Sequence, residues 1–208
     1  MVTGSIGLKG VVRKLGLAAS INEFDAHEIP PLTDEEALGL LATLAEHNDV
    51  PLSKPGQKKI LSLLGANWPI LLQLFISEIQ DGEFQKPPTT AELEAIYRNR
   101  LVNGSRNQYC DGMFNRLKDI FSDSERRLGR EILKAVCRSN NGLSREDFDL
   151  LHQKLEPALS QTTEGIEELD HVLDTLKHDG YVLQETAAPR RTRFGSNILR
   201  DFWLRKTD

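Results

Sequence analysis

The side chains whose chemistry is easiest to recognise in this sequence are arginines near its C-terminal end. Guanidinium groups bind phosphate oxygens, so a local cluster of them predicts weak contact with the backbone of DNA. The same cluster would serve equally to dock on an acidic surface of a protein partner, or would remain solvated. The residues concerned are Arg190, Arg191, Arg193 and Arg200, followed by Arg205 and Lys206.

Groups for phosphoryl transfer are harder to find. A phosphate-binding loop reads Gly, four residues, Gly, Lys and then Ser or Thr, because backbone N–H groups cradle the phosphates and the hydroxyl binds magnesium. The sequence after Gly4 imitates this pattern, but Lys9 follows Leu8, and Gly10 stands where the hydroxyl is needed. We interpret these glycines as turn residues. No apolar run ends in paired acids for magnesium, so we expect no ATP hydrolysis by this chain alone.

Metal sites and nucleophiles are not predicted either. No two histidines have the one-turn spacing of a zinc-binding helix, and all five are interpreted as lying among solvent-type residues. Ser5, Cys110 and Cys137 lack an evident general base. The histidines are His27, His47, His152, His171 and His178.

The composition is typical of a globular protein, and the two cysteines, which form no disulfide framework, lead us to expect a cytoplasmic one. Hydrophobic residues make up 39% and charged residues 27% of the 208 residues, which is too apolar for a disordered chain. The formal net charge of -5 gives no general attraction to nucleic acid or to anionic lipid. We therefore expect no membrane association, and we expect both cysteines to be reduced thiols.

One helix is expected to organise the first half of the chain. Residues 68–79 are apolar on nearly every side, which predicts a buried helix. Pro69 suits its first turn, and Gly65 suits a left-handed end of the preceding helix. Amphipathic helices before and after it, the first capped by Thr33 and Glu36, would cover it. Residues 30–121 are therefore predicted to form one helical bundle.

The second half has a different pattern. A cap at Ser122 begins a helix to about residue 138, a second helix follows Ser144, and a third spans 163–179. Residues 181–185 and 191–194 then predict a β-hairpin, followed by a last helix. Three helices before a hairpin is the order of a winged-helix domain, expected over 122–208. Its third helix usually reads DNA, yet here its exposed side is acidic and would repel phosphate.

Together these features resemble the C-terminal two thirds of an AAA+ type ATPase of the STAND group, close to the archaeal-type and related bacterial ATPases. The segment 3–8 looks like the end of the core strand that carries the sensor 1 residue, here Ser5. The segment 30–37 is similar to the linker and first lid helix. Gly65 to Pro69 resembles the Gly-x-Pro element of the lid, although it is longer, and 199–203 looks like the winged-helix ending.

The resemblance implies a mainly α fold. A short remnant of an α/β nucleotide-binding domain would occupy residues 1–29, a lid bundle 30–121 and a winged helix 122–208. It also implies that Gly65 and Pro69 lie near ATP, that ATP and magnesium belong to the complete family member, and that lid and winged helix close over the nucleotide. The abrupt start at Met1 leads us to expect that the ATPase core is missing or lies on another chain. The alternatives are a free-standing winged-helix DNA-binding regulator and a protein-interaction module.

Overall fold

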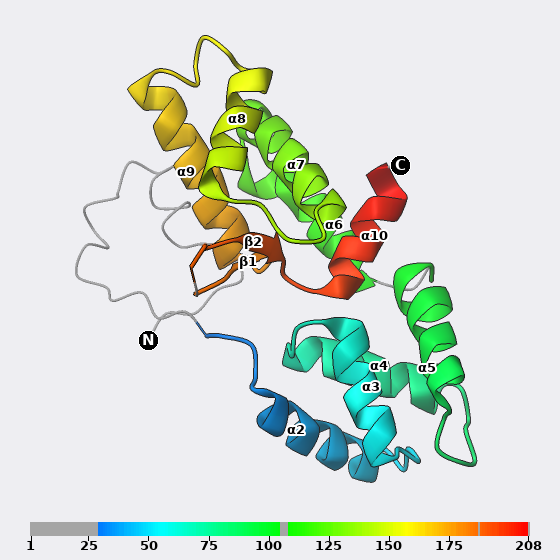
Figure 1. The fold of residues 1–208 in the computed structure, drawn as a ribbon. Coiled ribbons are helices and arrows are strands. Elements are labelled where there is room, and N and C mark those ends of the chain that lie inside the picture. The colour runs from blue at the N-terminus through cyan, green and yellow to red at the C-terminus, as the bar shows by residue number, and fades with distance from the viewer. Residues whose placement is uncertain (1–28, 105–107, 187, 208) are drawn as a thin grey trace, which may run out of the picture. The chain divides into compact units, whose positions relative to one another are not determined.

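A computed structural model describes residues 29–104, 108–186 and 188–207 of the chain (Figure 1). The described residues are mainly helical, with one small antiparallel sheet of two strands. Ser5 and the expected remnant of a nucleotide-binding domain lie outside them, apart from Ile29. Among the described helices, none is both long enough and apolar enough to cross a membrane.

Contacts divide the chain into two compact units, and each is described by itself. The helical unit consists of Ile29–Asp111 and Ser196–Arg205, and the hairpin unit contains Gly112–Gly195 with Lys206 and Thr207. This grouping differs from the expected one at the C-terminal end. The sequence placed 122–208 in one domain, whereas the segment Ser196–Arg205 packs with the helices of the first half.

Side-chain caps begin three helices of the helical unit, and the cap at Thr33 is the one that the sequence analysis predicts. Thr33 caps α2 in a complete capping box with Glu36, Ser53 caps α3, and Thr89 forms a second capping box with Glu92. Each cap satisfies a backbone N–H group that has no partner within the helix. The elements are α2 (Asp34–His47), α3 (Lys54–Leu64), α4 (Pro69–Gln80), α5 (Thr90–Ile96), a π-helical turn η2 (Tyr97–Val102), the start of α6 (Gln108–Ile120) and most of α10 (Asn197–Thr207).

The core of the helical unit is built around α4, as the sequence predicts. Its buried residues are Leu71, Leu72, Phe75, Ile76 and Ile79.

The expectation of burial on nearly every side is wrong in the first turn of α4, where the Ile70 side chain is 44% exposed. The last helix contributes apolar side chains to the same unit, because Ile198, Leu199, Phe202 and Trp203 of α10 are all buried.

After the larger part of α6, the hairpin unit has the predicted order of three helices and two strands. These are α7 (Asp123–Arg138), α8 (Arg145–Leu155), α9 (Thr163–His178), β1 (Val182–Gln184) and β2 (Thr192–Phe194). The strands pair antiparallel, with Val182 opposite Phe194 and Gln184 opposite Thr192. Leu143, between α7 and α8, also exchanges both backbone hydrogen bonds with Thr192, at 2.9 and 2.8 Å. The helical spacing of Ile166 with Leu169, Val172 and Leu176 predicts that it is buried with them on α9, but the Ile166 side chain is 49% exposed.

The two capping boxes of the helical unit lead to a prediction of how the stability of the protein depends on pH. The backbone N–H and hydroxyl of Thr33 donate to Glu36 and lower its pKa from 4.5, and Thr89 lowers the pKa of Glu92 in the same way. Because the folded pKa lies below the unfolded one, the stabilisation is complete above the unfolded pKa and is lost as the pH falls through the folded pKa. We therefore expect the free energy of unfolding to fall in acid. Urea unfolding at a series of pH values from neutral to acid should show a flatter pH dependence of the free energy of unfolding for the double variant Glu36→Gln, Glu92→Gln. An unchanged pH dependence would contradict the stabilising role of these two caps.

Candidate functional site

The joint between α3 and α4 is a left-handed turn at Gly65. Its φ is 71°, and its N–H donates to the Leu61 carbonyl at 3.0 Å. A Cβ atom on Gly65 would lie 2.5 Å from the Asn197 side chain of α10. Asn197 itself donates to the Ser62 carbonyl at 3.4 Å, near the end of α3. The position therefore requires glycine both for its backbone conformation and for the close approach of α10.

Asn67 fastens the joint to the segment that precedes α2. Its side-chain Nδ2 donates to the Leu32 carbonyl at 3.1 Å and to Asp34 Oδ1 at 2.8 Å, and its own carbonyl accepts from the Leu32 N–H at 3.1 Å. Asn67 is 9% exposed, so these bonds satisfy a nearly buried amide. Sequence reasoning missed this residue, and an asparagine inside a predicted turn was its only signal.

The start of α4 presents apolar surface to solvent. Pro69 and Ile70 are exposed and Trp68 is half-buried, although all three adjoin a well-packed core. Trp68 occupies the N-cap position, and among the described contacts it gives the helix no side-chain cap. The joint therefore combines an exposed apolar strip (Trp68, Pro69 and Ile70) with the positive end of a helix dipole. Such a surface suits a flat, partly apolar ligand group with electron-rich edges.

Arg200 of α10 is part of an internal network of the helical unit. Its guanidinium lies 2.9 Å from Asp201 Oδ1, and Tyr97 of η2 donates to the other oxygen, Oδ2, at 2.7 Å. Burial of the Tyr97 ring is the main cause that raises the pKa of Tyr97 well above its usual value of 10, and the hydrogen bond to Asp201 is the second cause. Arg200 therefore stabilises the carboxylate that holds α10 against η2.

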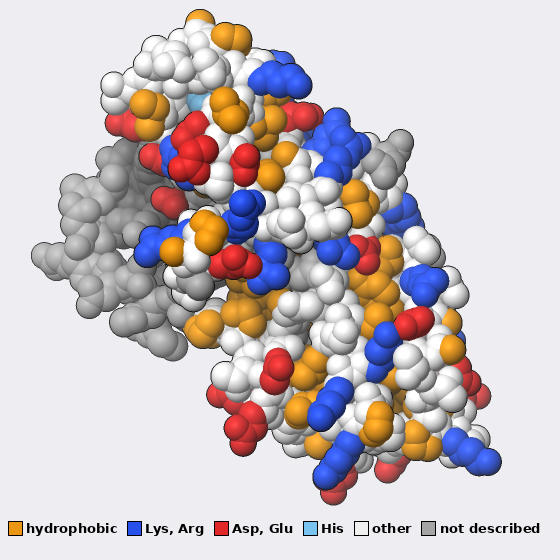
Figure 2. Space-filling model, in the orientation of Figure 1, with side chains coloured by type: hydrophobic (Ala, Val, Ile, Leu, Met, Phe, Trp, Pro, Cys, Tyr) orange, Lys and Arg blue, Asp and Glu red, His pale blue; other side chains and the backbone are white. Residues whose placement is uncertain are grey.

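The three hairpin arginines are differently placed. Arg193 Nε lies 3.0 Å from Glu185 Oε1 on the other side of the hairpin, and Arg191 donates to the Gly142 carbonyl at 3.2 Å. Arg190 is exposed. On the face drawn in Figure 2, Lys and Arg side chains around the hairpin are interspersed with Asp and Glu. Much of the positive charge that the sequence suggested is therefore balanced locally.

The third helix of the hairpin unit keeps the acidic surface that the sequence predicts. Glu164, Glu167 and Asp174 are exposed on α9, and Asp170 forms an ion pair with Arg145 of α8. A helix with this surface repels the phosphates of a DNA groove.

Contact of the hairpin with DNA stays a prediction, and its charges determine the expected strength. We expect weak binding to duplex DNA at low salt that disappears at physiological salt, because few arginines remain unbalanced. Arg190→Gln should remove most of this binding, whereas Arg193→Gln should remove less, since Glu185 already neutralises Arg193. A gel shift with a salt titration measures both. Tight binding that resists salt would contradict this expectation.

One histidine is not where the sequence interpretation put it. His152 of α8 is 2% exposed, although all histidines were expected among solvent-type residues. The reason is its helical spacing: it lies one turn after Phe148, which is also buried, so both residues occupy the inner side of α8. Within the described parts of the chain, no group of three or more His, Cys, Asp or Glu residues is arranged to hold a metal ion.

The chain was compared with models of protein families, with curated proteins and with solved structures, and none of the three comparisons gave a match.

Proposed function

We propose that this chain is the lid and winged-helix part of an AAA+ ATPase of the STAND group, and that it moves in response to the nucleotide without hydrolysing it. In this proposal the helical unit is the lid and the hairpin unit is the core of the winged helix. The catalytic groups belong to a nucleotide-binding domain outside residues 29–208. The observation that carries the proposal is the hydrogen-bonded joint at Gly65, which presents the apolar strip of Trp68, Pro69 and Ile70 to solvent.

The hairpin unit supports the winged-helix interpretation through its small sheet. Leu143 lies between the first and second helices and pairs with β2, so the hairpin gains a short third strand segment. That segment fixes the hairpin to the helices on one side. The acidic surface of α9 favours contact with a basic surface of a protein over contact with DNA, and it therefore favours the regulatory ATPase over a DNA-binding regulator.

The nucleotide fits the joint only in part. The exposed apolar strip suits the adenine ring, which stacks on flat or apolar side chains, and the N-terminal end of α4 favours a partial negative charge. The described residues offer no cradle of backbone N–H groups from a glycine-rich loop for the phosphates, and we assign no magnesium ligand among them. The lid alone therefore supplies orientation for the base, while stabilisation of the transferring phosphoryl group must come from elsewhere.

The test is a nucleotide titration of the full chain followed by NMR. We expect ATP and ADP at millimolar concentration to shift the Trp68 indole resonance and the backbone resonances of 65–70, without release of phosphate. Tripolyphosphate, which lacks the base, should leave the Trp68 indole resonance unchanged and should shift the backbone resonances of 65–70 less than ATP does. Pro69→Ala with Ile70→Ser should weaken the ATP response.

Two outcomes would overturn the proposal. The first is no change at Trp68 or 65–70 at any ATP concentration that leaves the protein folded. The second is steady ATP turnover by the purified chain that is abolished by changing Ser5, because turnover would require catalytic groups within these residues. Leu150→Ser is the matched control for the exposed apolar strip, since Leu150 is 64% exposed on α8 of the hairpin unit and should not alter the ATP response.

A further inference from the structure

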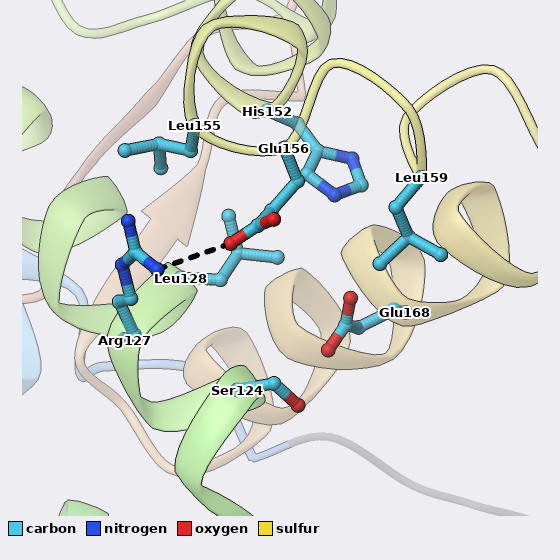
Figure 3. A pocket seen from close by; sticks show the side chains of 8 residues that line it. All are labelled: Ser124, Arg127, Leu128, His152, Leu155, Glu156, Leu159 and Glu168. Atoms are coloured by element: carbon cyan, nitrogen blue, oxygen red, sulfur yellow. Dashed lines mark hydrogen bonds and ion pairs between the residues drawn. The ribbon is translucent and has the colours of Figure 1, made fainter.

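The hairpin unit contains a small pocket that the proposed function does not use. It has a volume of about 140 Å³ and lies between α7, α8, α9 and the segment that joins α8 to α9 (Figure 3). An apolar cavity of roughly this size, about 150 Å³, holds a benzene molecule, so the pocket accommodates a ligand of about six non-hydrogen atoms. It is lined by Ser124, Arg127, Leu128, His152, Leu155, Glu156, Leu159 and Glu168.

The imidazole of His152 is the unusual feature of this pocket. The residue is almost fully buried, yet among the described residues its Nε2 atom has no hydrogen-bond partner. A buried polar atom without a partner is destabilising, so native structures rarely retain one without a role. Figure 3 shows the ring directed into the pocket, on the same side as the carboxylate of Glu168.

The charges of the lining favour a cation. Arg127 lies 3.2 Å from Glu156, and these two opposite charges balance each other. Glu168 of α9 is half-buried and has no ion-pair partner within the described residues, so its carboxylate is an unbalanced negative charge in the lining of the pocket. Leu128, Leu155 and Leu159 form the apolar part of the wall.

We propose that this pocket binds a small organic cation, a primary ammonium group carrying a short apolar chain. The ammonium donates one hydrogen bond to the Glu168 carboxylate and another to His152 Nε2, and the chain packs against the three leucines. This arrangement satisfies the buried imidazole and neutralises the unbalanced carboxylate at once. The inference does not depend on the proposed function, because all its residues lie in the hairpin unit and none belongs to the joint.

Three small ligands of nearly equal size separate the contribution of the charge from that of the apolar chain. Butylamine, butanol and butyrate share an apolar chain and differ in charge, and each is titrated into the full chain while the methyl resonances of Leu155 and Leu159 are followed. We expect butylamine to bind with a millimolar dissociation constant and to shift the His152 ring resonances. Butanol and butyrate should bind at least about tenfold more weakly, since each lacks the ammonium that the carboxylate attracts.

Substitutions then identify the groups responsible. Glu168→Gln should weaken the binding of butylamine at least about tenfold, which corresponds to the loss of one charge-assisted hydrogen bond. Glu167→Gln, an exposed neighbour on the same helix, should leave the affinity unchanged. Glu168→Asp, which keeps the charge, should retain part of the affinity.

The proposal is overturned by any of four results. If all three probes bind equally, the pocket is only an apolar cavity. If none of them shifts the leucine or His152 resonances, the pocket holds solvent alone. If Glu168→Gln binds butylamine as the unsubstituted chain does, the carboxylate is not the cation ligand. A butylamine response that Glu167→Gln abolishes to the same extent as Glu168→Gln would point to general surface charge and would also reject the site.

Discussion

Replacement of Trp203 by alanine is expected to lower the free energy of unfolding of the helical unit by about 3–5 kcal/mol. The Trp203 side chain is 1% exposed on α10, so its removal leaves a large cavity as well as a loss of apolar burial. The chain has two tryptophans, and Trp203→Ala therefore leaves Trp68 as the only indole. Urea unfolding followed by Trp68 fluorescence reports on the helical unit directly.

The same experiment tests whether α10 belongs to the helical unit. Trp203→Phe is the matched control, because it also isolates Trp68 but preserves an aromatic ring in the core, and its loss of stability should be clearly smaller. Asp201→Asn offers a second check, since it weakens the acceptor for Tyr97 and removes the charge that pairs with Arg200. The midpoint of urea unfolding, followed by Trp68 fluorescence, should be lower for Trp203→Ala than for Trp203→Phe. Equal midpoints for the two variants would contradict the packing of α10 in this unit.

Replacement of Gly65 by alanine is the second substitution that we expect to lower the free energy of unfolding strongly. Alanine at a φ of 71° is strained, and its Cβ would lie 2.5 Å from the Asn197 side chain, so we expect a loss of about 1–3 kcal/mol in the free energy of unfolding. The proposed function adds a consequence. If the joint orients Trp68, Pro69 and Ile70 toward the adenine ring, Gly65→Ala should weaken the ATP response even under conditions where the protein remains folded.

Gly39 provides a control with the opposite sign. It is an exposed residue inside α2, and a Cβ atom there would meet no atom within 4 Å. Gly39→Ala should therefore stabilise the helical unit by roughly 0.5–1 kcal/mol, because alanine favours the helix and restricts the unfolded chain. Thermal and urea unfolding under identical conditions measure the change in the free energy of unfolding for Gly65→Ala and for Gly39→Ala. Equal and small effects of both substitutions would contradict the requirement for glycine at the joint.

Local signals in the sequence were sufficient for most element boundaries. Thr33, Ser122 and Ser144 were each predicted as helix caps, and each forms the reciprocal hydrogen bonds of a capping box. The φ of Gly65 and the pairing of residues 182–184 with 192–194 were predictable for the same reason. In all these cases the interactions join residues close in sequence, so their pattern is visible without knowledge of the fold.

The partners of particular side chains were less predictable. Arg200 was grouped with the hairpin arginines because it follows them in the sequence, but Asp201 and the helical unit determine its place. His152 was expected among solvent-type residues, and the packing of α8 buries it beside a pocket instead. Ile70 and Ile166 are apolar residues at positions where burial was predicted, yet their side chains are 44% and 49% exposed.

The sequence by itself determined where most helices and both strands lie, since caps, turn glycines and apolar periodicity act over a few residues. It also determined the overall acidity of the chain and the absence of a complete phosphate-binding loop motif. Only the tertiary structure decided that α10 packs with the helical unit, that Asn67 and Asn197 brace the joint at Gly65, and that Glu185 balances Arg193. The physical reason is that burial and charge pairing depend on which distant segments meet, and no local pattern encodes that choice.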